Sequence, residues 1–416
     1  MSAPPALAAA VRCRPAGHTL PREFHLDESI YTYEIESIWR RSWLLAGCSA
    51  EASEQSDFFR FDVAGHSVIL VRDEAGALHA LHNTCRHRGM PVCPEPSGTV
   101  TRWVCPYHQW SYGLDGRLLG CGDMDIDPRL YRLRRAGVVE VGGLVFIWLA
   151  GLPEWFDDAR RDLGAALAPQ GLDRAKVAYQ IDYDVRANWK LVWHNNRECW
   201  HCHAGHPEYI RANFDTAPDS HRFRELASER AREHAAVLAG VSATNAPDTH
   251  AAPGLYRFPQ EDRWWAANRT PLVPGFVTES LDGSPVAPLM GDYPDYDVGT
   301  LRVRSVPNFW MHASADHAVL TRLVPAGPDR TMVRVQWLVA RDAAEGRDYD
   351  LERLLPFWRL TSEQDWALCE RNHSGIRNPA FTPGPYSPTR EYNLAAFDGW
   401  YLSRLVVECG PPGTRA

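Results

Sequence analysis

Two cysteines and two histidines alternate within a short part of the sequence and offer metal-binding side chains in an uncommon order. Cys85 and His87 are separated by one residue, and after seventeen further residues come Cys105 and His108. Two thiolates on one iron and two imidazoles on the other form a [2Fe–2S] cluster whose reduction potential lies above that of an all-cysteine cluster. The order Cys, His, Cys, His therefore predicts an electron-transfer centre.

A structural zinc ion is the main alternative for these four ligands, because two cysteines and two histidines also suit tetrahedral Zn²⁺. Zinc fingers, however, usually pair Cys-x₂₋₄-Cys with His-x₃₋₅-His, and a Cys-x-His pair does not supply that arrangement. The spacing therefore favours the iron–sulfur cluster. Cys93 and Cys121 are interpreted as ordinary reduced residues without a ligand role.

A second group of possible metal ligands lies near the middle of the chain, where His201, His203 and His206 end a segment that begins at Asn188. On an α-helix, residues three apart share a face, which places Glu198 beside His201. His203 is turned away from His201 by about 200° on the same helix. We therefore expect His201 and His206, rather than His203, to act together.

The convergence of His201 and His206 requires a break in the helix, because residues five apart are about 140° from each other on an unbroken helix. Gly205 and Pro207 supply that break. Two histidines and one distant carboxylate form the facial triad of non-haem Fe(II) oxygenases, which leaves positions open for O₂ and substrate. The alternative is that these histidines only pack near a helix end.

The first motif lies within short alternating apolar runs that are typical of antiparallel hairpins. Turns are expected at Ala64-Gly65 and at Glu74–Gly76. Strands are predicted within residues 58–83 and at 103–104, 111–119 and 144–149. Residues of roughly 45–150 are therefore expected to form a small all-β unit.

The rest of the chain mixes strand and helix patterns. We expect strands at 177–187, 301–306, 319–324 and 332–340, a helix from Trp189, a helix and mobile loop within 229–253, and a long helix capped by Asp350 and divided near Pro356. The predicted fold class is α+β, with an antiparallel sheet flanked by helices in the larger domain. The expected division is an N-terminal segment of residues 1–44 packing on the larger domain, the β domain at 45–155, and the larger domain at 156–416.

Length and composition limit the class of protein. The 416 residues predict two or three domains at roughly 100–200 residues each. Apolar residues at 45% and charged residues at 23% are typical of a soluble globular protein. The net charge of −8 gives no basic field for nucleic acid. The sequence has no uninterrupted apolar stretch of about 18 residues, as a membrane-spanning helix requires, and no clear signal peptide. We therefore expect no membrane association and a cytoplasmic location. The ten cysteines are interpreted as reduced thiols and metal ligands rather than a disulfide framework.

The chain resembles the catalytic α subunits of Rieske-type ring-hydroxylating oxygenases. The segments CRHRGMPVC and CPYHQWSYGLDGRLLG match the Rieske [2Fe–2S] pattern of that family. The segment from Asn188 to Pro207 matches its iron-binding signature, on which Asn195, Glu198, His201 and His206 fall. The resemblance implies a Rieske cluster in the β domain and a mononuclear Fe(II) in the larger, catalytic domain.

The resemblance also implies a third iron ligand late in the chain. Glu363-Gln364-Asp365 looks like the terminal motif of the family, and Asp365 is the expected ligand. Glu363 and Glu370 are alternatives, although Glu370 lies five positions from Asp365 and is poorly placed for the same point. The alternative for these three acidic residues is that they are solvated carboxylates on the surface of a helix, as most acidic residues are.

Electron supply and assembly follow from the same resemblance. It implies electrons from NAD(P)H through a separate flavin or iron–sulfur reductase or a ferredoxin, and a head-to-tail homotrimer. In such a trimer Glu198 would hydrogen-bond His108 of the neighbouring subunit while supporting His201. The alternative for Glu198 is a surface glutamate that only forms a salt bridge.

The substrate class is implied by likeness to the glycine betaine, choline, carnitine and stachydrine monooxygenase branch, in which the bridging acid is often Glu. Hydroxylation of an N-methyl carbon there gives a carbinolamine that collapses to formaldehyde and the demethylated amine. Two residues depart from the branch: His194 replaces the common Glu, and Trp200 the usual Tyr.

A quaternary ammonium substrate requires aromatic faces, each of which contributes about 0.5–2 kcal/mol to binding a cation. Trp264, Trp265 and Trp310 are candidates for such a box, although tryptophans at such positions more often pack in the core. Two other functions remain open: the same chemistry on an aromatic acid or secondary-metabolite scaffold, and an electron carrier that holds the Rieske cluster alone.

Overall fold

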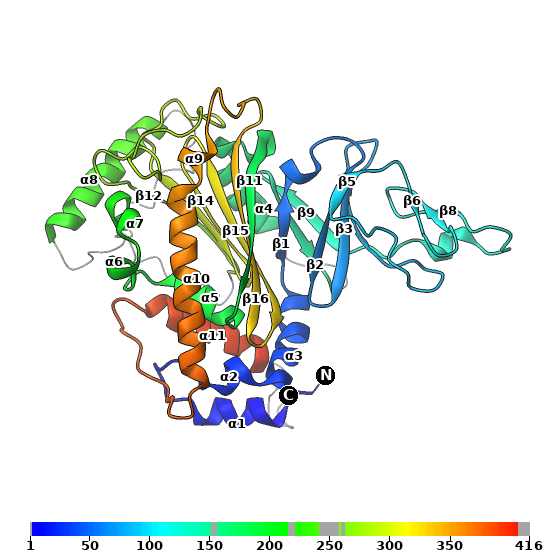
Figure 1. Ribbon diagram of the computed structural model, residues 1–416, viewed down its shortest axis with the longest axis horizontal. Coiled ribbons are helices and arrows are strands. Elements are labelled where there is room, and N and C mark those ends of the chain that lie inside the picture. Colours follow the sequence, from blue (N-terminus) through cyan, green and yellow to red (C-terminus); the bar gives the residue numbers. More distant parts are fainter. Residues whose placement is uncertain are drawn as a thin grey trace.

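The computed structural model describes residues 2–150, 156–214, 221–239, 241, 258 and 263–406. Figure 1 shows a β-rich unit on one side of the molecule and a larger unit built on one long sheet on the other. No helix within these described ranges combines the length and the apolar composition that a bilayer span requires.

The β-rich unit contains three small antiparallel sheets with strand orders β4-β3-β2-β5, β6-β7-β8 and β1-β10-β9. Its strands are β1 (Leu44–Cys48), β2 (Asp57–Val63), β3 (His66–Arg72), β4 (Leu78–His82), β5 (Ser97–Thr99), β6 (Trp103–Val104), β7 (Ser111–Tyr112), β8 (Leu118–Gly120), β9 (Gly137–Val141) and β10 (Leu144–Trp148). The predicted hairpins are confirmed. Ala64 and Gly65 join β2 to β3 with φ values of 53° and 74°, as a two-residue turn with positive φ at both positions requires.

The larger unit is organised around a six-stranded antiparallel sheet with the order β11-β16-β15-β14-β13-β12. Its strands are β11 (Ala175–Val185), β12 (Trp265–Thr270), β13 (Thr300–Ser305), β14 (Phe309–Ala313), β15 (Ala318–Gly327) and β16 (Arg330–Ala340). Four of these strands were expected from the sequence, and β12 and β14 were not. The α+β class with an antiparallel sheet flanked by helices is confirmed.

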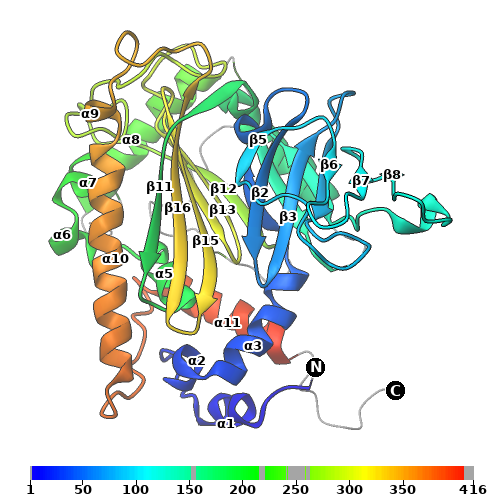
Figure 2. The same cartoon turned by 45° about the vertical axis from the view of Figure 1, so that its right-hand side comes forward.

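Helices cover the large sheet and close its lower end, where the N-terminal helices meet α11 (Figure 2). They are α1 (Pro5–Cys13), α2 (Glu23–Leu26), α3 (Glu28–Ser37), α4 (Asp157–Leu167), α5 (Trp189–Arg197), α6 (Cys202–Gly205), α7 (Pro207–Ala212), α8 (His221–Leu238), α9 (Leu351–Leu354), α10 (Pro356–Arg377) and α11 (Tyr392–Val406). The predicted division at Pro356 is confirmed, because α10 begins there. The expected helix near Glu229 belongs to α8, and most of the loop expected after it lies outside the described residues.

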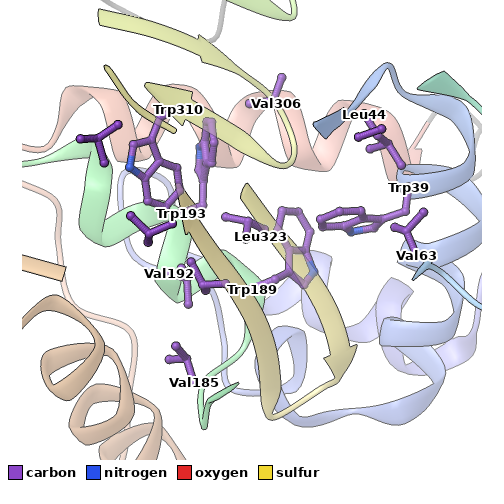
Figure 3. Close-up of a cluster of buried hydrophobic side chains, with 14 of the residues drawn as sticks. Trp39, Leu44, Val63, Val185, Trp189, Val192, Trp193, Val306, Trp310 and Leu323 are labelled. Carbon is purple, nitrogen blue, oxygen red and sulfur yellow. The ribbon is translucent and has the colours of Figure 1, made fainter. Parts of the chain in front are cut away.

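A buried aromatic core fixes α5 between the N-terminal helices and the sheet. Trp39 and Trp189 meet edge to face with ring centroids 5.3 Å apart. Trp193 packs in the same way on Trp310 at 5.8 Å, and Figure 3 shows these contacts on either side of Leu323. The segment that follows α5 and carries His201 and His206 therefore begins at a helix that is firmly packed in the core.

A buried ion pair also fixes α5. Lys190 Nζ lies 2.6 Å from Oε1 of Glu34 on α3, and both side chains are fully buried. Trp189 Nε1 donates to the other oxygen of Glu34 at 2.8 Å, and the hydroxyl of Tyr401 on α11 donates to Glu34 as well. Burial lowers the pKa of Lys190 although Glu34 opposes this shift. The N-terminal helices thus pack on the larger unit.

The chain enters and leaves the β-rich unit at neighbouring strands. β1 and β10 pair antiparallel, with Leu44 opposite Ile147. Asn308, from the loop before β14, exchanges two hydrogen bonds of 2.9 Å with the backbone of Leu45. The two ends of the β-rich unit are therefore held together against the large sheet.

Candidate metal centres

The first metal motif lies on two loops of closely similar backbone shape. In one loop, the amide of Gly89 donates to the carbonyl of Cys85 at 3.0 Å; in the other, the amide of Gln109 donates to that of Cys105 at 2.9 Å. Gly89 and Gln109 both have positive φ, at 81° and 59°. Each loop thus turns back on itself within five residues and presents one cysteine and one histidine.

The two loops bring their histidines together at an exposed tip. The rings of His87 and His108 lie 4.6 Å apart, and His87 stacks on Trp110 with an interplanar angle of 10°. Both cysteines are buried and reduced, and the Tyr112 hydroxyl lies 3.2 Å from Sγ of Cys85.

The residues of this tip fit a [2Fe–2S] cluster. The Nδ1 atom of His87 is buried and has no hydrogen-bond partner among the described residues, whereas buried nitrogens are normally satisfied. A metal bond accounts for this nitrogen. Two buried thiols and two facing imidazoles are the donor set that such a cluster with mixed ligands needs.

The second motif is built on three short helices rather than one. α5 ends at Arg197, and Glu198 has extended backbone angles; His206 separates α6 from α7. The predicted break between His201 and His206 is confirmed. Glu198 lies beside His201 as expected, but the expectation that one helix carries both residues is wrong, because the chain leaves the helix at Glu198.

Asp365 on α10 meets both histidines of the motif. Its Oδ1 atom lies 2.8 Å from Nε2 of His206 and 3.3 Å from Nε2 of His201. Burial lowers the pKa of His201, but hydrogen bonds to Asp365 and Glu198 outweigh burial and raise that pKa to about 10. The site therefore favours a positive charge between these three side chains, which a bound metal cation supplies.

The Nδ1 atoms of His201 and His206, which point away from Asp365, each contact a neighbouring polar side chain. Nδ1 of His201 lies 2.6 Å from Oε1 of Glu198, and Nδ1 of His206 lies 2.7 Å from the side-chain amide of Gln364. Such contacts fix the ring orientation and leave Nε2 for a metal. Asn195 Nδ2 lies 3.4 Å from Nε2 of His201. The three donors fit the two-histidine, one-carboxylate set of non-haem Fe(II) sites.

The alternative ligands lie elsewhere. Glu363 and His203 are exposed, and Oε1 of Glu370 accepts a hydrogen bond from the backbone amide of Arg186 at 3.0 Å. None of them joins the group that His201, His206 and Asp365 form.

A disulfide between Cys199 and Cys202 corrects the expectation that all ten cysteines are reduced thiols or metal ligands. It closes a short loop around His201, and Sγ of Cys202 lies 3.9 Å from Nε2 of that histidine. The Cys-x-x-Cys spacing was the signal that the sequence offered for this bond.

A cleft of about 1130 Å³, part of it open to solvent, adjoins the three converging side chains. One wall is α10, whose residues Trp358, Thr361 and Asp365 line the cleft. Their spacing of three and then four residues places them on one helix face. The ring of Trp358 lies 4.3 Å from that of His312 on β14.

A second wall of the cleft is the large sheet. Arg302 on β13 lies directly opposite Asn268 on β12 and His312 on β14, and Arg304 is two residues further along β13. All four residues line the cleft. They were not anticipated from the sequence, although two arginines at alternate positions of the apolar strand LRVRS were a usable signal.

The tryptophans expected to form an aromatic box do not line this cleft in the described part of the chain. Trp310 packs between Trp193 and Trp366, and Trp264 packs on Phe146; Trp265 lies under the guanidinium of Arg263. The aromatic rings that do line the cleft are Trp200, Tyr209, Trp358 and Tyr392.

The two centres and the fold define an oxygenase of the Rieske class. Residues 42–125 match the Rieske [2Fe-2S] domain, and residues 172–406 match the catalytic domain of the ring hydroxylating alpha subunit. The chain belongs to this family of ring-hydroxylating oxygenase α subunits. Its cofactors are a Rieske [2Fe–2S] cluster and a mononuclear iron, and its electrons come from a separate reductase. A carrier that holds the cluster alone is thereby excluded.

Individual relatives point to one branch. The glycine betaine monooxygenase oxygenase subunit of Chromohalobacter salexigens is 39% identical over 96% of this chain and 89% of its own. The quaternary ammonium Rieske monooxygenase CntA bound to L-carnitine has a TM-score of 0.68 at 18% identity, covering 93% of this chain and 95% of that one. A Rhodococcus naphthalene 1,2-dioxygenase has the same TM-score at 19% identity, with coverages of 94% and 95%. The fold alone therefore does not select the substrate.

Proposed function

We propose that the protein is a terminal oxygenase that removes an N-methyl group from a quaternary ammonium substrate of the betaine type. The observation that carries this proposal is the convergence of His201, His206 and Asp365 on a cleft lined by both aromatic rings and guanidinium groups. The relative that is named a glycine betaine monooxygenase subunit adds support.

The proposed reaction inserts one oxygen atom of O₂ into a methyl C–H bond, and two electrons and two protons convert the other atom to water. The carbinolamine then loses a proton and separates into formaldehyde and the demethylated amine. When bound, the cluster supplies electrons and the iron supplies O₂ activation. Cys85, His87, Cys105 and His108 are proposed to hold the cluster.

The chain's own residues have separate tasks in this reaction. His201, His206 and Asp365 are proposed to hold the iron, while Glu198 and Gln364 keep Nε2 of the two histidines directed at it through their contacts with Nδ1. The face of Trp358 is suited to the ammonium group, because a cation over an aromatic face is attracted by the ring quadrupole.

The separation of the two centres supports electron transfer between subunits. In both views the loops between β6 and β8 and the short helix α6 lie at opposite sides of the chain (Figures 1 and 2). His108 and its neighbour Tyr107 are exposed. We propose a head-to-tail homotrimer in the cytoplasm, in which His108 of one subunit approaches Glu198 of the next.

A substrate panel tests the proposed function. The purified protein, loaded with both metal centres, is combined with a surrogate reductase and NAD(P)H and offered glycine betaine, carnitine, choline and an aromatic acid. We expect formaldehyde release matched to O₂ consumption with at least one quaternary ammonium compound. Turnover of the aromatic acid with inert ammonium compounds would overturn the proposal.

A further inference from the structure

The sulfur of Cys202 lies on the metal side of His201. Nδ1 of His201 is in contact with Glu198, so Nε2 is the nitrogen left for a metal. Sγ of Cys202 lies 3.9 Å from that same Nε2. One possible ligand atom from each of His201, Cys202 and His206 lies within 4.8 Å of the other two. Cys202 therefore adds a sulfur atom to the group of donors at the proposed iron site.

The separations between these donors fit one tetrahedral metal ion. A sulfur ligand at about 2.3 Å and a nitrogen ligand at about 2.0 Å from such an ion lie about 3.5 Å apart. The Sγ atom of Cys202 is close to this separation from Nε2 of His201. Oδ1 of Asp365 lies 3.3 Å from the same Nε2 and 2.8 Å from Nε2 of His206. Two imidazoles, a carboxylate and a thiolate together form a donor set that suits Zn²⁺.

The disulfide between Cys199 and Cys202 controls whether this sulfur can bind a metal. The form of cysteine that binds a metal is the thiolate, and in the structure Sγ of Cys202 is bonded to Sγ of Cys199 instead. The oxidised protein therefore offers two histidines and one carboxylate, a set that leaves positions open for O₂ and substrate. Reduction of the disulfide releases a fourth donor at the same point.

A dithiol reductant can reach the disulfide through the cleft. Both cysteines line the cleft, and Cys199 is only half-buried whereas Cys202 is buried. A thiolate of the reductant attacks Sγ of Cys199, and Cys202 leaves as a thiolate. The second thiol of the reductant then displaces Cys199 and closes the reductant's own disulfide. Two electrons pass to the protein; of the two protons of the dithiol, one goes to Cys199 and the other to solvent.

We propose that reduction of the disulfide converts the mononuclear iron site into a zinc site, with the thiolate of Cys202 as the fourth ligand beside His201, His206 and Asp365. Thiolate ligands select zinc, whereas the loosened segment holds Fe(II) less firmly. Zn²⁺ has no redox chemistry, so the reduced, zinc-bound protein is inactive as an oxygenase. Disulfides of cytoplasmic proteins are usually transient and are often redox sensors. This inference rests on the metal ligands of the proposed function and is independent of the substrate.

X-ray absorption at the zinc edge tests the inference without turnover, because the iron of the cluster does not contribute to the signal. The mononuclear iron is removed with a chelator, the cluster is kept, and one Zn²⁺ per chain is added. We expect only nitrogen and oxygen ligands at about 2.0–2.1 Å in the oxidised protein, and one sulfur ligand at about 2.3 Å after dithiol treatment and removal of the dithiol. Competition with a fluorescent chelator should show at least 10-fold tighter zinc binding in the reduced protein.

Three serine variants identify the sulfur. Cys202→Ser should show no sulfur ligand in either state, and its affinity for zinc should not respond to the dithiol. Cys199→Ser leaves Cys202 as a thiol without any reductant, so the sulfur ligand should be present from the start. Cys13→Ser, at an exposed free cysteine, is the matched control and should behave as the native protein does in both states. The cluster spectrum verifies that each variant is folded.

The outcomes separate the inference from the proposed function. Zinc without a sulfur ligand in the reduced native protein, or a sulfur ligand that persists in reduced Cys202→Ser, would overturn the inference even if the oxidised, iron-loaded protein releases formaldehyde. A zinc–sulfur bond that depends on Cys202, in a protein that demethylates no quaternary ammonium compound when oxidised and iron-loaded, would support the inference and overturn the proposed function. Failure of both native forms to bind zinc would overturn the metal ligands and the inference with them.

Discussion

Asp365 on α10 and His206 between α6 and α7 lie within 2.8 Å of each other through Oδ1 and Nε2, although 159 positions separate them in the chain. The contact exists because α10 packs along both α5 and α7. His201 reaches the same carboxylate from the start of α6. Three side chains from two distant segments can thereby hold one cation.

Replacement of Asp365 by alanine is expected to remove the mononuclear iron and leave the cluster. Iron analysis should fall from about three to about two irons per chain, since the cluster accounts for two. Formaldehyde release should fall below detection. The visible and EPR spectra of the cluster should be unchanged.

Glu363→Ala is the matched control for Asp365, because Glu363 is exposed on the same helix. It should retain all the iron and full turnover. Loss of iron in the control together with retention in Asp365→Ala would reassign the third ligand to Glu363.

Replacement of Glu198 by glutamine tests its role between the two centres. Glutamine keeps the length of the side chain and can still accept from Nδ1 of His201, so the iron content should stay close to that of the native protein. Turnover should fall at least 100-fold because the negative charge is lost. Freeze-quench EPR should show that the reduced cluster is oxidised more slowly in the variant.

Glu225→Gln, at an exposed position on α8, is the control, and it should change neither turnover nor the rate at which the cluster is oxidised. Native turnover in Glu198→Gln would instead assign Glu198 to an ordinary surface contact. Loss of iron without a change in electron transfer would limit Glu198 to holding His201.

Reduction of the Cys199–Cys202 disulfide is expected to loosen the segment that presents His201. A dithiol should raise the mass of the corresponding peptide by two hydrogen atoms. Cys199→Ser should lose the mononuclear iron to a chelator severalfold faster than the native protein, with the cluster unaffected. Cys13→Ser, at an exposed free cysteine, is the control. If a chelator removes the iron equally fast from both variants, the disulfide does not hold the segment that presents His201.

His234 on α8 gives the stability of the protein a predictable pH dependence. Burial lowers its pKa to about 4, although the nearby Asp297 opposes this and Arg230 and Arg269 add to it. In the unfolded chain the same ring titrates near 6.5. Between these values the unfolded state binds more protons, so the free energy of unfolding falls as the pH falls, by up to about 1.4 kcal/mol per pH unit.

His234→Asn should remove this contribution. Urea unfolding at pH 7 and pH 5 should show a smaller loss of stability on acidification in the variant than in the native protein, whatever the absolute stability of the variant. An identical loss in both proteins would show that His234 does not titrate in this window.

Much of the candidate site could be predicted because its residues are close together in the sequence. The spacing of Cys85, His87, Cys105 and His108 defines two loops, and Gly205 and Pro207 mark the break that lets two histidines converge. Asp365 could be selected only through a family resemblance, since nothing local connects a carboxylate on α10 with a histidine 159 positions earlier.

The wall that the large sheet forms in the cleft could not be predicted, because it depends on strand register. Arg302, Asn268 and His312 form one row only after β12, β13 and β14 have paired, and two of those strands were missed. The tryptophans proposed for the box pack in the core instead, since neither size nor hydrophobicity distinguishes a ring that binds a ligand from one that fills space.

The pairing of β1 with β10 has a consequence for engineering. Leu44 and Ile147 are paired residues of β1 and β10, and Asn308 holds β1 on the large sheet. The segment that carries the cluster ligands therefore begins and ends at two adjacent strands that are fixed to the larger unit. A module exchanged between the end of β1 and the start of β10 should therefore transplant the cluster, with its own potential, into a foreign oxygenase without disturbing the substrate cleft.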